Sequence, residues 1–363
     1  MSGSVTILGG GNTAFAVAAN LALTGVEVTL CEISGFEAAV APIRASRQIE
    51  LNGVAKTGVA TLQQVTMDFG EALSTNDVVL LIIPSYGHRA FAEACAPHLR
   101  DGQIVVLMPG NLGSLEFAKI VRDCGGAEIV LAETDTAPYV CRKLTPTSAT
   151  IWGVVNAMGC AAFPSRENER VQQTLELLFP GIQLYDHVLA CGLAAMNPVV
   201  HPAGVLLNAG RIEYSRGDFY FYEEGVMPGV CNLIYAVDRE RLAVAETLGA
   251  KLPPVDEAFH LAGFGPQGDL WSTINGSRML TQLRAPGSLQ NRWLTEDVPY
   301  GIASWCQLGN QLGVECPTIA SLVQLISAMS GTDFWNETRT PARLGIANLE
   351  REALLALVAD GPT

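Results

Sequence analysis

The chain has 363 residues, of which 49% are hydrophobic and 16% are charged. This size exceeds what one hydrophobic core usually supports, so we expect two globular domains. The net charge of −14, with no basic cluster longer than Arg142-Lys143, argues against a nucleic-acid surface. The longest apolar stretches, such as residues 78–84, fall far short of the roughly 20 residues that a membrane span needs.

Nine cysteines are dispersed along the chain, with no C-x-x-C pair and no Cys/His cluster at zinc spacing. An odd number in a chain of this size favours reduced thiols over a disulfide framework, and no metal site is indicated. A strand pattern begins at Val5 with no basic segment before it. We therefore expect a cytoplasmic protein.

The first half alternates buried strands with helices. Strands are predicted at residues 4–8, 26–32, 78–83, 104–108 and 129–132, and helices at 12–24 and 88–99. Continuous apolar strands separated by helices indicate a parallel sheet covered on both faces. The predicted fold class is α/β, with an N-terminal doubly wound Rossmann-type domain over residues 1–186.

From residue 187 to 363 the pattern predicts an all-α domain, because strand signals nearly vanish. Helices are predicted at residues 188–208, 230–248, 302–312 and 319–330. The Gly/Pro-rich stretch 251–287 has no clear prediction.

A glycine-rich turn follows the first predicted strand and opens the first helix. It reads Gly9-x-Gly11-x-x-Ala14, with Asn12 and Thr13 at the start of the helix. The first glycine permits a tight turn, the second lets backbone approach a pyrophosphate, and the small third residue lets helix pack on strand. The N–H groups of the helix N-terminus favour phosphate. These five residues are predicted to bind a dinucleotide, although a nucleotide-free flavodoxin-like turn remains the alternative.

Glu32 ends the second strand, 23 positions after Gly9. A carboxylate there would accept the ribose hydroxyls of the adenosine and repel a 2′-phosphate. NAD(H) is therefore preferred, while Arg44 and Arg47 keep NADP(H) open. Pro84 and His88 follow the strand at 78–83 and are predicted to approach the nicotinamide.

Further segments along nearly the whole chain resemble the octopine/opine dehydrogenase family. They are I-I-P-S-Y-G-H-R, V-V-L-M-P-G-N-L-G-S, E-T-D-T-A-P-Y-V-C-R, N-P-V-V-H-P-A-G-V-L-L-N-A-G-R-I-E, R-W-L-T-E-D-V-P-Y-G and R-T-P-A-R-L-G. The resemblance implies that His201 and Asp297 form the catalytic pair and that Arg292 binds a substrate carboxylate. Ser114 departs from the family's P-G-N-x-G-G turn, where a glycine is expected.

Chemistry supports a histidine near the reacting bond, because imidazole exchanges protons near neutral pH. Pro202 after His201 predicts a helix that starts at the proline, with the histidine at its cap. A capping or core histidine is the alternative for His201, and an ordinary turn is the alternative for Asp297.

Carboxylate substrates call for bidentate donors. Arg292 is the first candidate and Arg142 the second, with surface ion pairs as the alternative for both. Asn208 lies seven residues after His201 on one helical face, where it would bind substrate or nicotinamide, or serve as a structural amide.

The resemblance implies reductive joining of a 2-oxo acid, with pyruvate as first choice, to an amino acid in the cleft between the domains. Expected partners are these small molecules, with no nucleic acid and no membrane, and a homodimer is left open. A ketopantoate reductase or glycerol-3-phosphate dehydrogenase type of enzyme is the nearest rival. Such enzymes place a catalytic lysine on the helical domain, and no lysine lies near His201 in this sequence. A non-enzymatic NAD(H) sensor is the alternative of another class.

Overall fold

The computed structural model describes residues 3–362, and these form two compact units. The first unit contains Met1–Val188 together with Val358–Thr363, and the second contains Leu189–Leu357. The sequence predicted one domain from residue 187 to residue 363. In the structure, the chain from Val358 onward instead belongs to the first unit. There the Arg166 guanidinium donates a hydrogen bond to the Asp360 carbonyl, which ties the chain end to the first unit.

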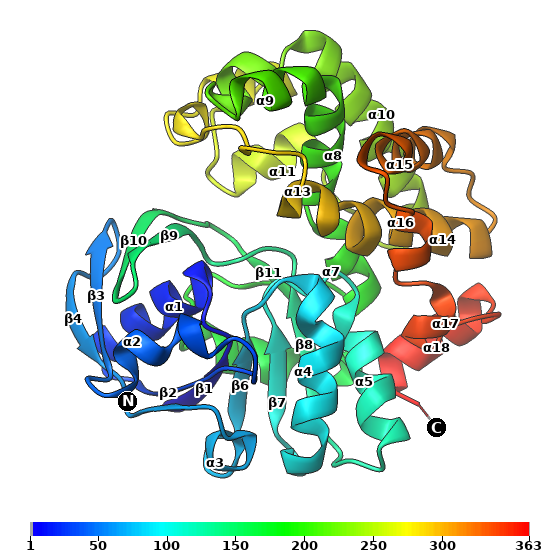
Figure 1. Ribbon diagram of the computed structural model, residues 1–363. Helices are drawn as coiled ribbons and strands as arrows, with labels where there is room; N and C mark the ends of the chain where they lie inside the picture. The colour runs from blue at the N-terminus through cyan, green and yellow to red at the C-terminus, as the bar shows by residue number, and fades with distance from the viewer. Residues whose placement is uncertain (1–2, 363) are drawn as a thin grey trace. The chain divides into compact units, whose positions relative to one another are not determined.

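An eight-stranded sheet forms the centre of the first unit, in the order β12-β11-β8-β7-β6-β1-β2-β5 (Figure 1). All neighbours pair in parallel except β11 with β8. The strands are β1 (Ser4–Leu8), β2 (Glu27–Cys31), β5 (Gln64–Thr66), β6 (Val78–Leu81), β7 (Ile104–Leu107), β8 (Val130–Thr134), β11 (Gly159–Phe163) and β12 (Gln183–Leu184). The predicted doubly wound fold is confirmed, and its five predicted strands are β1, β2, β6, β7 and β8.

A second sheet of four strands lies in the same unit, in the order β4-β3-β10-β9. Its strands are β3 (Gln48–Gly53), β4 (Gly58–Thr61), β9 (Tyr139–Thr145) and β10 (Ser148–Val154). No pattern in the sequence predicts these strands, because each has exposed residues that interrupt the apolar run. Helix α1 (Asn12–Leu23) contacts strands of both sheets, so almost its whole surface is apolar and buried.

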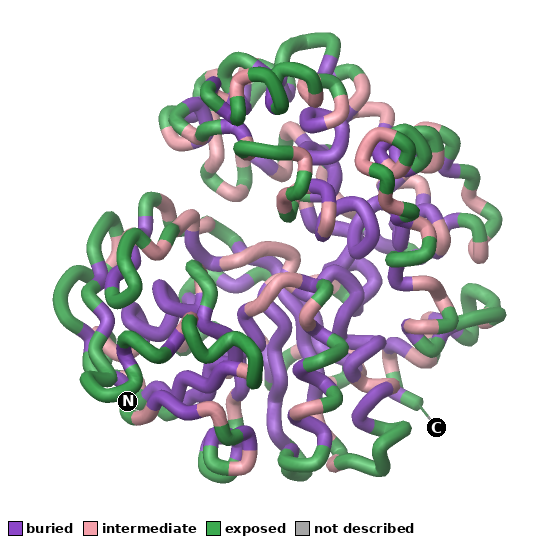
Figure 2. Tube along the Cα trace, viewed as in Figure 1, coloured by how far each residue is buried: buried purple, intermediate pink, exposed green. Residues whose placement is uncertain are grey.

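The remaining helices of the first unit flank the large sheet. They are α2 (Ala41–Arg44), α3 (Phe69–Leu73), α4 (His88–Cys95), α5 (Gly113–Asp123) and α6 (Asn168–Glu176). Helices α4 and α5 pack side by side near β7 and β8 (Figure 1). Figure 2 shows that the central strands are buried along most of their length, as expected for a sheet covered on both faces.

The second unit is helical, as predicted. Its helices are α7 (Val188–Ala194), α8 (Asn197–Leu207), α9 (Ala209–Ser215), α10 (Pro228–Thr247), α11 (Val255–Leu261), α12 (Leu270–Asn275), α13 (Arg292–Thr295), α14 (Ala303–Gln311), α15 (Pro317–Ser330), α16 (Phe334–Glu337) and α17 (Pro341–Leu344). Helix α18 (Arg351–Asp360) begins in this unit and ends in the first, which the chain enters again at Val358. Two π-helical turns also occur, η5 (Phe221–Gly225) and η7 (Val298–Ile302). The stretch 251–287, left without a prediction, contains α11 and α12.

The predicted single helix over 188–208 is wrong, because the chain forms two helices, α7 and α8. Pro198 sits at the start of α8, where a proline fits a first turn but cannot continue a preceding helix. The stretch 188–207 is long and apolar enough to span a membrane, yet 89% of its apolar window is buried in the structure. Its apolar character is therefore explained by its place in a protein core.

Candidate active site

The glycine turn after β1 has the geometry that a dinucleotide loop needs. Gly9 has a φ of +117°, and a Cβ there would lie 2.6 Å from the carbonyl oxygen of Ile82. Gly11 precedes α1 as its N-terminal cap, and a Cβ on it would meet nothing within 4 Å. The first glycine is thus required by the fold, whereas open space at the second suits the approach of a pyrophosphate.

The start of α1 carries the other predicted loop residues. The side-chain oxygen of Asn12 accepts a hydrogen bond from the Lys143 backbone N–H at 3.0 Å, and Ala14 is fully buried. The Thr13 hydroxyl lies 3.8 Å from the Cys141 thiol. Helix α1 has no acidic residue in its first turn and no side-chain cap, so the dipole at its N-terminus suits an anion.

Glu32 follows β2 and turns back toward the loop. Its Oε1 accepts the Ile33 backbone N–H at 2.9 Å, and a Cβ on Gly10 would lie 2.9 Å from its Oε2. Burial is the largest effect on the pKa of this carboxyl and raises it above its ordinary value. Backbone hydrogen bonds and the nearby Lys143 ammonium oppose that rise. The carboxylate is therefore next to the loop, where an adenosine ribose would be recognised.

Pro84 and His88 lie on either side of a short 3-10 turn after β6, and His88 begins α4. His88 is buried, and a Cβ on Gly113 would lie 2.4 Å from its Nδ1. The structure thus packs this ring against the start of α5. Its predicted contact with a nicotinamide stays a prediction.

Ser114, where the family turn has glycine, lies in the first turn of α5. Its backbone N–H and that of Leu112 each donate to the buried Glu133 carboxylate at 3.2 Å, with Asn111 and Leu112 both at positive φ. Among residues 3–362, the Ser114 hydroxyl is buried with no hydrogen-bond partner.

We expect Ser114→Ala to stabilise the protein by about 1 kcal/mol. On folding, the buried hydroxyl loses its hydrogen bonds to water and gains no hydrogen bond to the protein, and alanine removes this cost. The backbone bond to Glu133 is kept. Urea unfolding of both proteins would measure the difference. A variant that is less stable than wild type would show that the hydroxyl is hydrogen-bonded in solution.

Asp135 follows β8 and lies in the E-T-D-T-A-P segment. Its two oxygens accept the Gly159 backbone N–H at 3.0 Å and the Tyr185 hydroxyl at 2.9 Å. Burial raises the pKa of this carboxyl from 3.8 to about 7. The folded protein therefore holds a proton at Asp135 in a pH range where the unfolded chain has lost it.

Because the folded protein binds this proton more tightly than the unfolded chain, the free energy of unfolding should fall as the pH rises from about 4 to about 7. Above that range, Asp135 should cause no further change. Asparagine keeps the size and does not ionise. The stability of Asp135→Asn relative to wild type should therefore be higher at pH 8 than at pH 5. Urea midpoints at the two pH values would measure this, and an equal difference at both would contradict the raised pKa.

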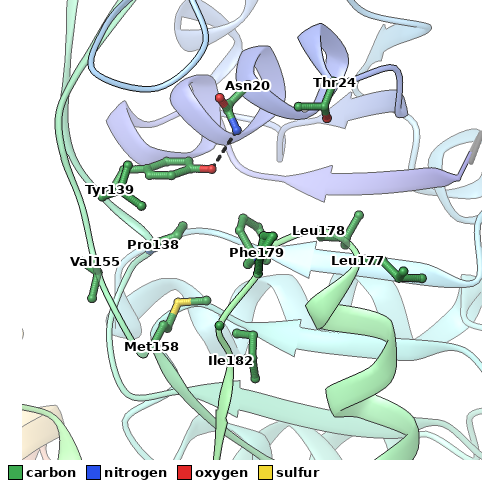
Figure 3. A pocket seen from close by; sticks show the side chains of 13 residues that line it. Asn20, Thr24, Pro138, Tyr139, Val155, Met158, Leu177, Leu178, Phe179 and Ile182 are labelled. Atoms are coloured by element: carbon green, nitrogen blue, oxygen red, sulfur yellow. Dashed lines mark hydrogen bonds between the residues drawn. The ribbon is translucent and has the colours of Figure 1, made fainter. Parts of the chain in front are cut away.

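A pocket of about 210 Å³ lies in the first unit, beside the C-terminal half of α1 (Figure 3). Asn20 donates to the Tyr139 hydroxyl at 2.8 Å on its wall, and Phe179 and Met158 supply apolar surface. Asn20 lies about 12 Å along the helix from Asn12. This pocket is therefore separate from the glycine loop.

His201 lies within α8 and not at its cap. The predicted helix start at Pro202 is wrong, because α8 begins at Asn197 and Pro202 is inside it. Proline at that position removes one intrahelical N–H, but the segment from Pro198 to Val205 is buried throughout. Tertiary packing thus overrides the local preference of a residue before proline.

Both ring nitrogens of His201 have hydrogen-bond partners. Its Nδ1 lies 2.7 Å from Oδ2 of Asp297, 96 residues away, and its Nε2 lies 2.9 Å from the Tyr222 hydroxyl. Because a carboxylate only accepts, Nδ1 carries the proton and Nε2 accepts from the tyrosine in the neutral ring. Burial raises the pKa of Asp297, and its hydrogen bond with His201 opposes that rise.

Aromatic side chains fix the plane of the His201 ring. Trp293 stacks on it, with ring centroids 4.3 Å apart and planes 12° apart. Phe221 meets both rings at an angle, with centroids 6.5 Å from His201 and 4.6 Å from Trp293. The imidazole is thus confined on its face as well as at both nitrogens.

The carboxylate partner is positioned by wide helical turns. The Asp297 N–H bonds to the Arg292 carbonyl at 3.3 Å, and the Ile302 N–H bonds to the Asp297 carbonyl at 3.1 Å. Both are i to i+5 bonds of the π type, which are rare and often found at functional sites.

The predicted substrate ligands lie in different places. Arg292 is on α13, with 56% of its side chain exposed, and forms an ion pair with the buried Glu296 at 2.7 Å. Arg142 is exposed on β9 of the first unit, next to Lys143. Asn208 uses its amide nitrogen to donate to the Gly204 and Gly225 carbonyls at 2.9 and 3.0 Å, which supports the structural alternative.

Tyr222 and Trp293, which contact His201, were not predicted from the sequence. The segment F-Y-F-Y-E-E-G at residues 219–225 has neither helical nor strand periodicity. Its π-helical turn could therefore not be predicted from the spacing of its apolar residues. Trp293 lies inside the quoted R-W-L-T-E-D-V-P-Y-G segment, next to Arg292, which was the only useful signal.

The chain is similar to known proteins along its whole length. A family model described as NAD/NADP octopine/nopaline dehydrogenase, alpha-helical domain, matches residues 184–330. An opine dehydrogenase of Arthrobacter sp. (strain 1C) is 31% identical over 358 residues, which are 98% of this chain and 99% of that protein. Solved octopine dehydrogenase with NADH and L-arginine superposes with a TM-score of 0.79 at 21% identity, covering 100% of this chain and 99% of that one.

The rival class is also similar in fold, but less so. A ketopantoate reductase from Ralstonia eutropha JMP134 superposes with a TM-score of 0.58 at 18% identity, covering 90% of this chain and 98% of that one. The rival class would need a catalytic lysine in the second unit. Lys251 lies in that unit, but it is exposed in the loop between α10 and α11. From its likeness along the full length, the chain belongs to the opine dehydrogenase family of NAD(P)-dependent oxidoreductases.

Proposed function

We propose that the protein reduces the imine formed between a 2-oxo acid, with pyruvate first, and the amino group of an amino acid. The family relation supports this, and octopine dehydrogenase itself has been solved with NADH and pyruvate. The observation that carries the proposal is the 2.7 Å bond between His201 and Asp297. A paired imidazole is an acid–base group of the kind that the condensation to the imine requires.

The glycine loop, α1 and Glu32 would hold NADH, with NADPH as the second choice. When bound, this cofactor supplies hydride to the imine carbon. His201 would accept a proton as the amine attacks and return one as water leaves. Asp297 would hold the ring in one tautomer and stabilise the imidazolium.

Arg292 would bind a substrate carboxylate through its exposed guanidinium, with its ion pair to Glu296 limiting its freedom. Arg142, through its place on β9, and the oxygen of Asn208 are weaker candidates for substrate contacts. We expect a cytoplasmic enzyme, and a homodimer stays a prediction.

A cofactor-oxidation screen tests the proposal directly. Pyruvate and related oxo acids are each combined with a panel of amino acids, with NADH and with NADPH, beside ketopantoate and dihydroxyacetone phosphate. We expect turnover only where an oxo acid and an amine are both present, faster with NADH. Cofactor binding without turnover on any pair would favour the NAD(H) sensor, and turnover of ketopantoate alone would favour the rival reductase.

A further inference from the structure

We propose that Tyr222 carries protons between the substrate nitrogen or oxygen and His201, an inference that rests on the proposed function. The Nε2 of His201 is the only ring nitrogen not held by Asp297, and the Tyr222 hydroxyl occupies it at 2.9 Å. While this bond holds, a substrate cannot reach Nε2 directly. The relay places the substrate against the oxygen of the tyrosine, which can accept one proton as it donates another.

The backbone keeps Tyr222 in this position. Its turn η5 is fixed at one end by the Phe221 N–H, which donates to the Leu283 carbonyl at 2.9 Å. At the other end, the amide of Asn208 donates to the Gly225 carbonyl. These two bonds fix the backbone of the turn from which the Tyr222 side chain extends to Nε2.

Packing between α8 and η5 also places Tyr222 next to His201. Gly204 lies three residues after His201 on α8, and a Cβ there would lie 2.5 Å from the Phe221 ring. The glycine lets η5 approach the helix closely enough for the next residue, Tyr222, to meet the imidazole. Only 5% of the Tyr222 surface is exposed, so the residue is largely shielded from bulk water.

The proton steps balance through this residue. The ammonium group of the amino acid gives one proton to the Tyr222 oxygen while the tyrosine proton passes to Nε2, and the neutral amine then attacks the oxo carbon. A second proton moves from the attacking nitrogen to the new alkoxide oxygen, which gives the carbinolamine. The imidazolium then returns a proton by the same route to the hydroxyl of the carbinolamine, whose C–O bond breaks to release water. The iminium carbon accepts hydride, and the product amine takes up one proton from solvent.

Tyr222 remains a neutral phenol throughout. Burial raises its pKa well above the ordinary value, and the Asp297 carboxylate raises it further. A phenolate is therefore avoided, and each transfer moves two protons together. This is the feature that separates a relay from a tyrosine that only packs against His201.

The test compares Tyr222→Phe with wild type in the oxo acid plus amine assay. We expect kcat to fall about 100-fold or more, because general acid–base transfer contributes on the order of 10²- to 10⁴-fold. The KM of each substrate and the Kd of NADH should stay within about threefold. Tyr235→Phe is the matched control, because that hydroxyl also makes two hydrogen bonds in the second unit, to Asp256 and Leu270.

A Tyr222→Phe kcat within about threefold of wild type would overturn the relay, as would an equal loss in Tyr235→Phe. A second measurement needs no variant: kcat of wild type in mixtures of H₂O and D₂O should curve with deuterium fraction, since two protons move together. A straight line would also overturn it. The outcomes are separable from failure of the proposed function, which would appear as wild-type inactivity across the whole panel.

Discussion

Asp297→Asn is expected to lower kcat about 10²- to 10⁴-fold while leaving the fold and NADH binding intact. The carboxylate accepts the Nδ1 proton of His201 at 2.7 Å in a buried setting, where its charge is needed to stabilise an imidazolium. An asparagine amide has no charge, and its NH₂ group can force the opposite tautomer, which would place the ring proton on Nε2. That nitrogen could then no longer accept from Tyr222.

Steady-state kinetics with saturating NADH and pyruvate would measure this loss, together with the Kd of NADH from fluorescence. Asp218→Asn is a suitable control, because it removes a carboxylate that is 81% exposed in the same unit. We expect the control to keep its kcat. An Asp297→Asn enzyme as fast as wild type would remove Asp297 from the mechanism.

The parallel sheet could be predicted because its strands are buried on both faces. Strand β6, for example, is a run of Val and Leu with only its first residue partly exposed. Strands β3 and β4 contain exposed polar residues and glycines, so their sequence resembles loops. What distinguishes them is pairing with distant strands such as β10, which no local pattern records.

At the site, too, residues in a contiguous motif could be predicted, whereas contacts between residues far apart in the sequence could not be predicted from local patterns. Gly9 and Gly11 were identified from a contiguous motif, and the structure gives each the conformation or space that the motif requires. The pairing of His201 with Asp297 spans 96 residues and came from family resemblance alone. Tyr222 was missed because its role depends on a π-helical turn and on Gly204, which together bring it to the imidazole.

Local rules also gave one wrong result at the site. A residue before proline is biased away from helix, so His201 was expected at a helix cap. The α8 segment instead continues through Pro202, since the buried contacts of its neighbours outweigh the lost hydrogen bond. The consequence is functional, because a histidine inside a buried helix is held more firmly than one at a frayed end.

A buried ion pair on α10 links this helix to neighbouring segments of the second unit. Arg241 is fully buried and bonds to Oδ1 of Asp238 at 2.8 Å through its Nε. It also donates to the Leu193 carbonyl of α7 and to the Pro253 carbonyl before α11, both at 2.9 Å. Asp238 in turn accepts the Val255 N–H at 2.9 Å. One guanidinium thus joins α10 to the segments on either side.

Arg241→Met is expected to lower the free energy of unfolding by about 3–5 kcal/mol, because it leaves the Asp238 carboxylate buried without its cation. Urea unfolding would measure the loss. Arg170→Met is the matched control: its ion pair with Glu167 is also at i,i+3 spacing, but its side chains are 49% and 28% exposed, so about 1 kcal/mol or less is expected. The double variant Asp238→Leu/Arg241→Met should recover part of the loss, since no unpaired charge remains. A single-variant loss as small as that of the control would mean that water reaches Asp238 and that the pair does not hold these helices together.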